Sequence, residues 1–188
     1  QREAEAKRRI GLGVTGLADA LLMVGLRYGS VEAAAQTEAW MHQIARAAYL
    51  ASVDLAKEKG AFALFDAEGY LASGAMEQMD ADVRDAIAKH GIRNALLTSI
   101  APTGTISQEA GWTMSRALSN GTIPSISVTS GPEPVFAAGH TRKDNSGTTR
   151  VRHDLFPADP ATWPDYLVTA ADVPPEEHVL MQAALAAF

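Results

Sequence analysis

The sequence predicts a helix-rich α/β fold, and three observations support this class. The chain has 188 residues, of which 47% are hydrophobic and 20% are charged, and this balance is typical of a globular protein with a sizeable core. Residues 31–59 repeat apolar side chains at helical spacing. Residues 95–100 ("ALLTSI") form an apolar run of strand length that ends at a Pro-Thr-Gly turn over 102–104.

The first half of the chain is expected to be mainly helical. Residues 16–26 predict a short helix, and Ser30 is placed to cap the long helix over 31–59 that ends at Gly60. The buried stripe of that long helix is expected to contain six side chains: Trp40, Ile44, Ala47, Ala48, Ala51 and Leu55.

Two segments separate the long helix from the strand-like run. Glycines and aromatic residues over 62–74 predict a packed loop with aromatic anchors. Residues 80–90 predict a charged helix that is capped by Asp80 and ends at Gly91.

The second half carries weaker patterns. Residues 112–130 are rich in Ser, Thr and Gly and predict a loop, and residues 135–152 predict a hairpin that turns at 144–147. Four prolines over 159–175 predict an irregular extended segment, and residues 176–188 predict a helix with acidic residues in its first turn. We expect residues 1–188 to form a single domain, because no repeat and no linker interrupts them.

Composition excludes several classes of function. A net charge of −6 argues against a nucleic-acid partner. No apolar run reaches the length of a membrane span and no secretory leader is visible, so we expect a cytoplasmic protein without a membrane contact. The chain has no cysteine, which excludes disulfides and thiolate chemistry within it. The five histidines show no metal-ligand spacing, so no metal site is expected.

One glycine motif and one hydroxyl-rich loop suggest phosphate binding. Gly11, Gly13 and Gly16 have the spacing of a dinucleotide fingerprint, but the polar stretch before them does not predict the buried strand that the fingerprint needs. Glycines that allow close backbone packing are therefore the favoured interpretation. In the second segment, "LLTSIAPTGTISQ", a strand-like run meets a turn and a helix start, where free N–H groups and small hydroxyl side chains form an anion site. An ordinary capped turn explains the same residues equally well.

Four segments resemble ribonucleotide reductases, most closely the adenosylcobalamin (vitamin B12)-dependent class. The stretch "RNALLTSIAPTGTIS" (93–107) resembles the loop that binds the substrate phosphate in that family, and "RRIGLGVTGLADALL" (8–22) resembles the helix after its active-site loop. The stretch "SGPEPVFA" (130–137) is similar to the family's Ser-Gly-x-Glu-Pro segment, and 163–184 ("WPDYLVTA" and then "PPEEHVLMQAA") is similar to the approach to a later helix. The four segments follow the family's order.

The resemblance implies the helix-rich part of a ten-stranded α/β barrel that is incomplete at both ends, since the chain starts at Gln1 and stops inside a predicted helix. It implies a radical enzyme that reduces ribonucleoside di- or triphosphates with adenosylcobalamin and a thiol reductant such as thioredoxin. The family's catalytic cysteines would lie outside this chain, so we expect no catalytic residue in it and no activity from it alone. Unpaired strand edges are expected to favour self-association.

The residues that the resemblance assigns to the substrate phosphate form one loop: Ala101, Pro102, Thr103, Gly104, Thr105, Ile106 and Ser107. Two features depart from the family pattern. An extra stretch stands at about 112–126, and Pro132 replaces the family's usual apolar residue before Glu-Pro. These departures, together with the absence of cysteine, leave a second hypothesis open, namely a non-catalytic phosphate-binding or scaffold module derived from the barrel.

Overall fold

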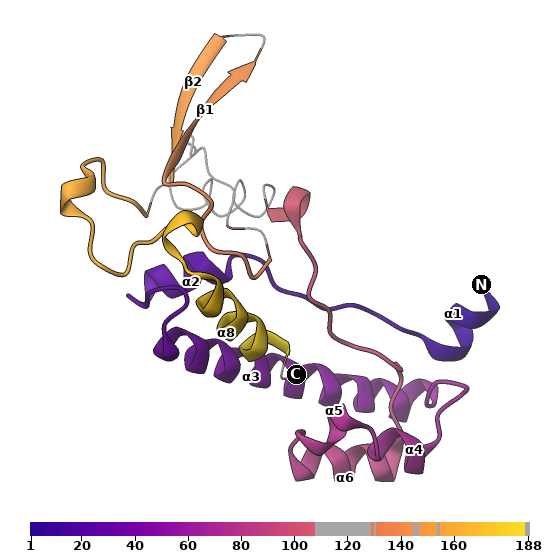
Figure 1. The fold of residues 1–188 in the computed structure, drawn as a ribbon. Coiled ribbons are helices and arrows are strands. Elements are labelled where there is room, and N and C mark those ends of the chain that lie inside the picture. The colour runs from indigo at the N-terminus through magenta and orange to yellow at the C-terminus, as the bar shows by residue number, and fades with distance from the viewer. Residues whose placement is uncertain (108–128, 130, 145–146, 154, 187–188) are drawn as a thin grey trace. The chain divides into compact units, whose positions relative to one another are not determined.

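The computed structural model describes residues 1–107, 129, 131–144, 147–153 and 155–186 (Figure 1). The chain divides into two compact units. The first unit comprises residues 1–13, 38–99 and 185–188, and the second comprises residues 14–37 and 100–184. The expectation of a single domain over residues 1–188 stays a prediction. The predicted loop over 112–130, apart from residue 129, and the extra stretch at about 112–126 lie outside the described residues.

The first unit is built from helices. It contains α1 (Arg2–Lys7), most of the long helix α3 (Val31–Lys59), α4 (Ala67–Leu71), α5 (Gly74–Glu77) and α6 (Ala81–His90). The bounds of α3 are those that the sequence predicts. The Oγ of Ser30 accepts from the Ala33 N–H at 3.0 Å, and Gly60 ends the helix with φ of 79°. Both caps follow from local backbone chemistry.

The core of this unit lies where α5 and α6 run beside the C-terminal half of α3 (Figure 1). Its fully or almost fully buried side chains come from all three helices and the segments between them: Ala45, Tyr49, Val53, Phe62, Met76, Met79, Val83, Ile87, Ile92 and Leu97. Apolar burial of this kind is the main favourable contribution to folding.

The buried face of α3 is rotated away from the predicted stripe, of which Trp40, Ile44 and Ala48 are half-buried. Leu55 is 38% exposed, and Ala47 and Ala51 are exposed as well. The buried face instead contains Ala33, Ala34, Thr37, Ala45, Tyr49, Ser52, Val53 and Ala56. Hydropathy alone misplaces the face because two of its members are polar, and Ser52 is buried with hydrogen-bond partners.

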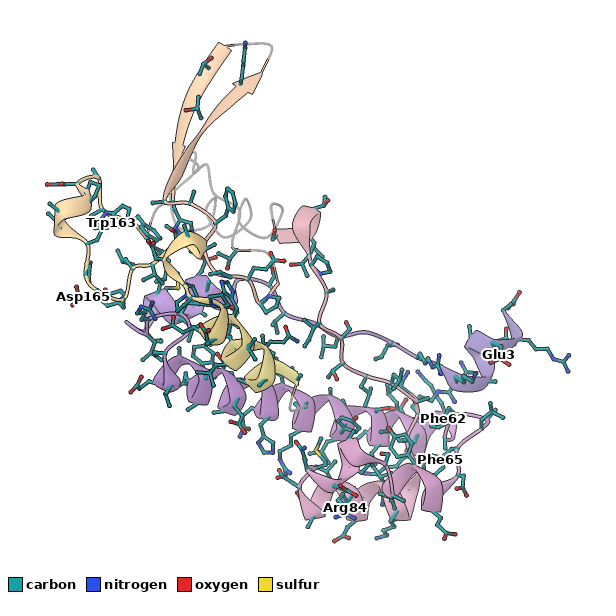
Figure 2. All side chains as sticks on the ribbon, viewed as in Figure 1. Glu3, Phe62, Phe65, Arg84, Trp163 and Asp165 are labelled. Carbon is teal, nitrogen blue, oxygen red and sulfur yellow. The ribbon has the colours of Figure 1, made fainter. Side chains whose placement is uncertain are left out.

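The segment over 62–74 is not wholly a loop, because α4 forms within it. The Asp66 side chain accepts from the Gly69 N–H at 2.8 Å and caps this short helix. The predicted aromatic anchors are present: the rings of Phe62 and Phe65 pack edge to face with centroids 5.5 Å apart, and Tyr70 lies beside both (Figure 2).

Helix α6 begins after Asp80 and ends at Gly91, as predicted, but the Asp80 side chain does not cap it. Its carboxylate lies 2.8 Å from Arg46 Nη1 and 3.1 Å from His42 Nε2, both on α3. Arg46 also pairs with Asp82, and this guanidinium lowers the pKa of Asp82 to about 2. The charged groups therefore tie α6 to α3 rather than satisfying the first turn of α6.

The run over 95–100 is extended but forms only an isolated bridge instead of the predicted strand. Leu12 pairs in parallel with Thr98: the Leu12 N–H donates to Leu97 O at 2.7 Å and the Ser99 N–H donates to Leu12 O at 2.9 Å. A Cβ on Gly11 would lie 2.8 Å from Ser99 Oγ, and one on Gly13 would lie 2.8 Å from Ser99 O. The expected close packing is thus confirmed at Gly11 and Gly13.

A buried amide fixes the start of this extended run. Asn94 is 8% exposed, its Nδ2 donates to Arg8 O at 2.7 Å, and its Oδ1 accepts from Ser52 Oγ at 2.9 Å. The backbone N–H of Asn94 donates to the same Ser52 oxygen at 3.1 Å. Residue 94 is therefore joined to α3 and to the chain after α1 by fully paired polar groups.

The second unit contains α2 (Leu17–Met23), the start of α3, the hairpin of β1 (Gly139–Asp144) and β2 (Gly147–Arg152), and most of α8 (Pro175–Ala186). The strands are antiparallel with Asp144 opposite Gly147, so the predicted hairpin and turn position are confirmed. The stretch between the hairpin and α8 is irregular apart from two short 3-10 turns over 160–162 and 170–172. Trp163 there packs edge to face on Phe156 with centroids 4.9 Å apart (Figure 2).

Sheet structure in the described part of the chain consists of this two-stranded sheet and the Leu12–Thr98 bridge, and it closes no barrel. None of the helices in that part has the length and apolar content needed to span a membrane.

Candidate functional site

The loop over 101–107 combines a left-handed residue with the start of a helix. Thr103 has φ of 51°, residues 104–107 are helical, and the Ser107 N–H donates to Thr103 O at 2.9 Å. No described residue accepts from the N–H groups of Gly104, Thr105 or Ile106, and all three residues are exposed. Three backbone donors at one turn therefore lack an acceptor among the described residues, and unpaired donors at a helix start are what an anion site needs.

Two of the predicted hydroxyls point into the protein rather than toward this turn. Ser107 is 1% exposed, and its Oγ donates to Gly104 O at 3.0 Å. Thr103 Oγ1 accepts from the Gly131 N–H at 2.6 Å and donates to Thr15 Oγ1 at 3.1 Å. The side chains of Thr103 and Ser107 thus shape the loop, whereas Thr105 is the loop hydroxyl residue that stays exposed.

A chain of hydrogen bonds links Thr103 through Thr15 to Thr129. Thr15 Oγ1 continues it by donating to Thr129 O at 2.9 Å, and the Gly16 N–H donates to the same oxygen at 2.8 Å. Thr129 is two positions from Gly131, whose N–H donates to Thr103 Oγ1. A Cβ on Gly131 would lie 2.6 Å from Ala101 O, so the loop and this segment touch backbone to backbone.

An acidic residue that the sequence reasoning did not single out completes this arrangement. Asp19, in the first turn of α2, is 6% exposed, and its Oδ2 accepts from the Thr129 N–H at 2.6 Å and from Thr129 Oγ1 at 3.3 Å. Its Oδ1 lies 2.8 Å from His153 Nε2. The available signal is a single acid among the apolar residues of "GLADALL", but its partners are distant in the sequence.

The chain after Gly131 is anchored by Tyr28. This side chain is 5% exposed, and its hydroxyl donates to Pro132 O at 2.8 Å. Burial raises the pKa of Tyr28 to about 12, and the charge of Glu133 adds to the shift. The nearby pair of Arg27 and Glu177, 2.6 Å apart, joins the segment between α2 and α3 to the first turn of α8.

The raised pKa of Tyr28 predicts a loss of stability in alkali. Because the folded protein holds the phenol proton more tightly than the unfolded chain, the Tyr28 contribution is complete below pH 10 and declines as the pH rises toward 12. Thermal unfolding midpoints between pH 9 and about 11 should therefore fall less steeply in Tyr28→Phe than in the parent protein. Parallel curves for the two proteins would contradict this linkage.

Gly104 and two of the histidines complete the description of the candidate residues. A Cβ on Gly104 would meet no atom within 4 Å, so the space in front of this glycine is open. His42 lies beside Asp80, and the His178 ring lies 6.2 Å from that of Tyr28. Among the side chains that the structure describes, no group of three or more His, Asp or Glu residues is placed to hold a metal ion.

Comparison with known proteins gives a consistent family. The family described as "Ribonucleotide reductase, barrel domain" matches residues 1–188. A vitamin B12-dependent ribonucleoside-diphosphate reductase of Mycobacterium tuberculosis (strain CDC 1551 / Oshkosh) is 33% identical over 97% of the chain, which corresponds to 26% of that protein. The ribonucleoside-diphosphate reductase large chain of Schizosaccharomyces pombe is 36% identical over 56% of the chain and 14% of its own length.

A further relative is the ribonucleoside-diphosphate reductase subunit alpha of Chlamydia pneumoniae, which is 35% identical over 57% of the chain and 12% of its own length. The chain thus spans about a quarter of the B12-dependent relative and a smaller share of the other two. Because the match to the barrel domain runs through every residue, the chain belongs to the ribonucleotide reductase family, as a part of its barrel domain.

Proposed function

We propose that this chain supplies the substrate-phosphate loop, residues 101–107, of a vitamin B12-dependent ribonucleotide reductase. The observation that carries the proposal is the turn at 104–106, where three exposed backbone N–H groups lack an acceptor among the described residues. The match to the reductase barrel domain and the names of the B12-dependent relatives support the rest of it. In the whole protein, this chain would form part of a ten-stranded α/β barrel.

Backbone donors suit this task because they carry no net charge and cannot be repositioned by side-chain rotation. The N-terminus of a helix favours negative charge, and a phosphate oxygen accepts several N–H bonds there. Holding the 5′ phosphate in one place fixes the ribose at the other end of the substrate, which converts binding energy into orientation for the chemical step. The alternative of a non-catalytic module derived from the barrel would use the same loop without the reaction.

The whole protein is proposed to use adenosylcobalamin, as the names of two B12-dependent relatives suggest. The described residues contain no donor set that identifies a cobalamin site, so none is assigned to the cofactor and no step is derived through it. A ribonucleoside di- or triphosphate as the substrate, a thiol reductant such as thioredoxin, self-association of the isolated chain and a cytoplasmic location remain parts of the proposal.

Gly104→Ala tests the loop directly. The added methyl group meets no atom within 4 Å, so the fold should not change, but it fills the space that a phosphate oxygen would need. In the full-length reductase, the KM for the ribonucleotide should rise about tenfold, which corresponds to ~1.4 kcal/mol of lost binding. Steady-state kinetics and equilibrium dialysis with the nucleotide measure this change.

Gly74→Ala is the matched control. Gly74 is also the first residue of a helical segment and also has open space around its missing Cβ, but it lies in α5 of the other unit. We expect its KM to equal that of the parent enzyme. An unchanged KM in Gly104→Ala, with normal folding, would refute the assignment of the phosphate to this loop.

A further inference from the structure

The buried carboxylate of Asp19 hydrogen-bonds Thr129, two positions before Gly131, which touches the loop at Ala101. Asp19 accepts both the backbone N–H and the hydroxyl of Thr129 on a single oxygen, at 2.6 and 3.3 Å. Side-chain burial is nearly complete, since 8% of the Asp19 side chain is exposed. A hydrogen bond to a charged acceptor is stronger than one between neutral groups, and burial makes its loss costly.

The contacts continue from Thr129 to the loop without a gap. Thr129 O receives the Thr15 hydroxyl, Thr15 receives the Thr103 hydroxyl, and Thr103 receives the Gly131 N–H. Thr103 is the left-handed residue that sets the direction of the turn at 104–106. A shift of Thr129 would therefore disturb Thr15 and Gly131, the two hydrogen-bond partners that hold Thr103 in this strained conformation.

We propose that Asp19 is a positioning residue for substrate-phosphate binding: its carboxylate holds Thr129, and through Thr15 and Thr103 it orients the backbone N–H groups of residues 104–106. Asp19 itself does not touch the phosphate, because it is buried and its described partners are Thr129 and His153. This inference rests on the proposed function of the loop and adds a residue from α2 to it.

The ring of His153 lies beside the other oxygen of the Asp19 carboxylate. Its Nε2 lies 2.8 Å from Asp19 Oδ1, its side chain is 10% exposed, and its ring packs edge to face on Phe156 at 5.4 Å. His153 directly follows β2, so the end of the hairpin lies next to Asp19. The hydrogen bonds of Asp19 lead through Thr129 toward the loop. The approach at Oδ1 lacks hydrogen-bond geometry, so the hydrogen bonds that fix the carboxylate are the two that Oδ2 accepts from Thr129.

The test compares Asp19→Asn with Thr15→Val in the full-length enzyme. Asparagine keeps the size of the side chain but removes its charge, and valine keeps the size of threonine but removes the hydroxyl link. Binding of cytidine 5′-diphosphate and of cytidine is measured by equilibrium dialysis. Each variant should weaken the diphosphate about tenfold and leave cytidine unchanged, because only the phosphate contacts the loop.

The double variant gives the readout that a purely structural role would not. If Asp19 and Thr15 act through one network, the loss of diphosphate affinity in the double variant should be clearly smaller than the product of the two single losses. Asp54→Asn, which removes an exposed carboxylate paired with Lys57 on α3, is the control and should bind both ligands normally.

The outcomes separate the two proposals. Equal weakening of cytidine and its diphosphate, or independent effects of Asp19 and Thr15, would overturn the positioning role. So would normal diphosphate binding in both variants while Gly104→Ala binds it weakly. If Gly104→Ala also binds normally, the loop itself is wrongly assigned and the proposed function fails with it. Should Asp19→Asn not fold, Thr129→Val, which removes the hydroxyl that donates to Asp19 Oδ2, takes its place in both comparisons.

Discussion

Replacing Gly131 with alanine is expected to destabilise the second unit strongly and to distort the phosphate loop. Gly131 has φ of 44°, a left-handed conformation that costs other residues about 1–2 kcal/mol. The new Cβ would also lie 2.6 Å from Ala101 O, a backbone atom that cannot move aside without moving the loop. The Gly131 N–H would then leave Thr103 Oγ1, and the support behind the turn would be lost.

Two measurements check this expectation in the full-length protein: the thermal unfolding midpoint and the KM for the ribonucleotide. Gly60→Ala is the matched control, because Gly60 also has positive φ, of 79°, but a Cβ there meets nothing within 4 Å. It should show the conformational cost alone and a normal KM. Equal destabilisation by the two substitutions, with equal KM values, would show that the contact with Ala101 does not matter.

Ile87→Ala is expected to have the second large effect, this time on the first unit alone. Ile87 is fully buried on α6 within the core cluster formed with α3 and α5. Removing its methyl and methylene groups loses their transfer free energy and leaves a cavity, which together cost about 2–5 kcal/mol. That is a large share of the ~5–15 kcal/mol that holds a typical domain folded.

A graded series makes the measurement specific. Ile87→Val should lower the free energy of unfolding by about 0.5–1.5 kcal/mol, and Leu64→Ala, at a side chain that is 58% exposed, should have little effect. Urea unfolding, monitored by amide hydrogen exchange in α6, measures the free energy of unfolding of this unit. If Ile87→Ala and Leu64→Ala behaved alike, the core would not be where the structure places it.

The sequence predicts those parts of the fold that local chemistry decides. The bounds of α3 follow from Ser30 and Gly60, and the turn of the hairpin follows from the residues at 144–147, because a cap or a tight turn depends on neighbours along the chain. The helix α4 inside the segment 62–74 was missed because its five residues are too few to show a period.

Features that depend on distant partners could not be predicted in the same way. The buried face of α3 is misread because Ser52 is buried with Asn94, a residue 42 positions away. The candidate phosphate loop was identified by its resemblance to a family rather than by its chemistry, which fits a capped turn equally well. The sequence does not point to Asp19, because its partner Thr129 lies 110 positions away and one acid in an apolar helix has no diagnostic pattern.

The packing of Gly11 and Gly13 on Ser99 gives the two glycines different evolutionary freedom. Alanine at position 11 collides mainly with the Ser99 side chain, so a smaller residue at 99 would act as a second-site suppressor and the two positions should covary. Alanine at position 13 collides with the Ser99 carbonyl, which every residue possesses, so no replacement at 99 compensates. We therefore expect position 13 to accept only glycine, whereas position 11 accepts alanine once residue 99 is smaller.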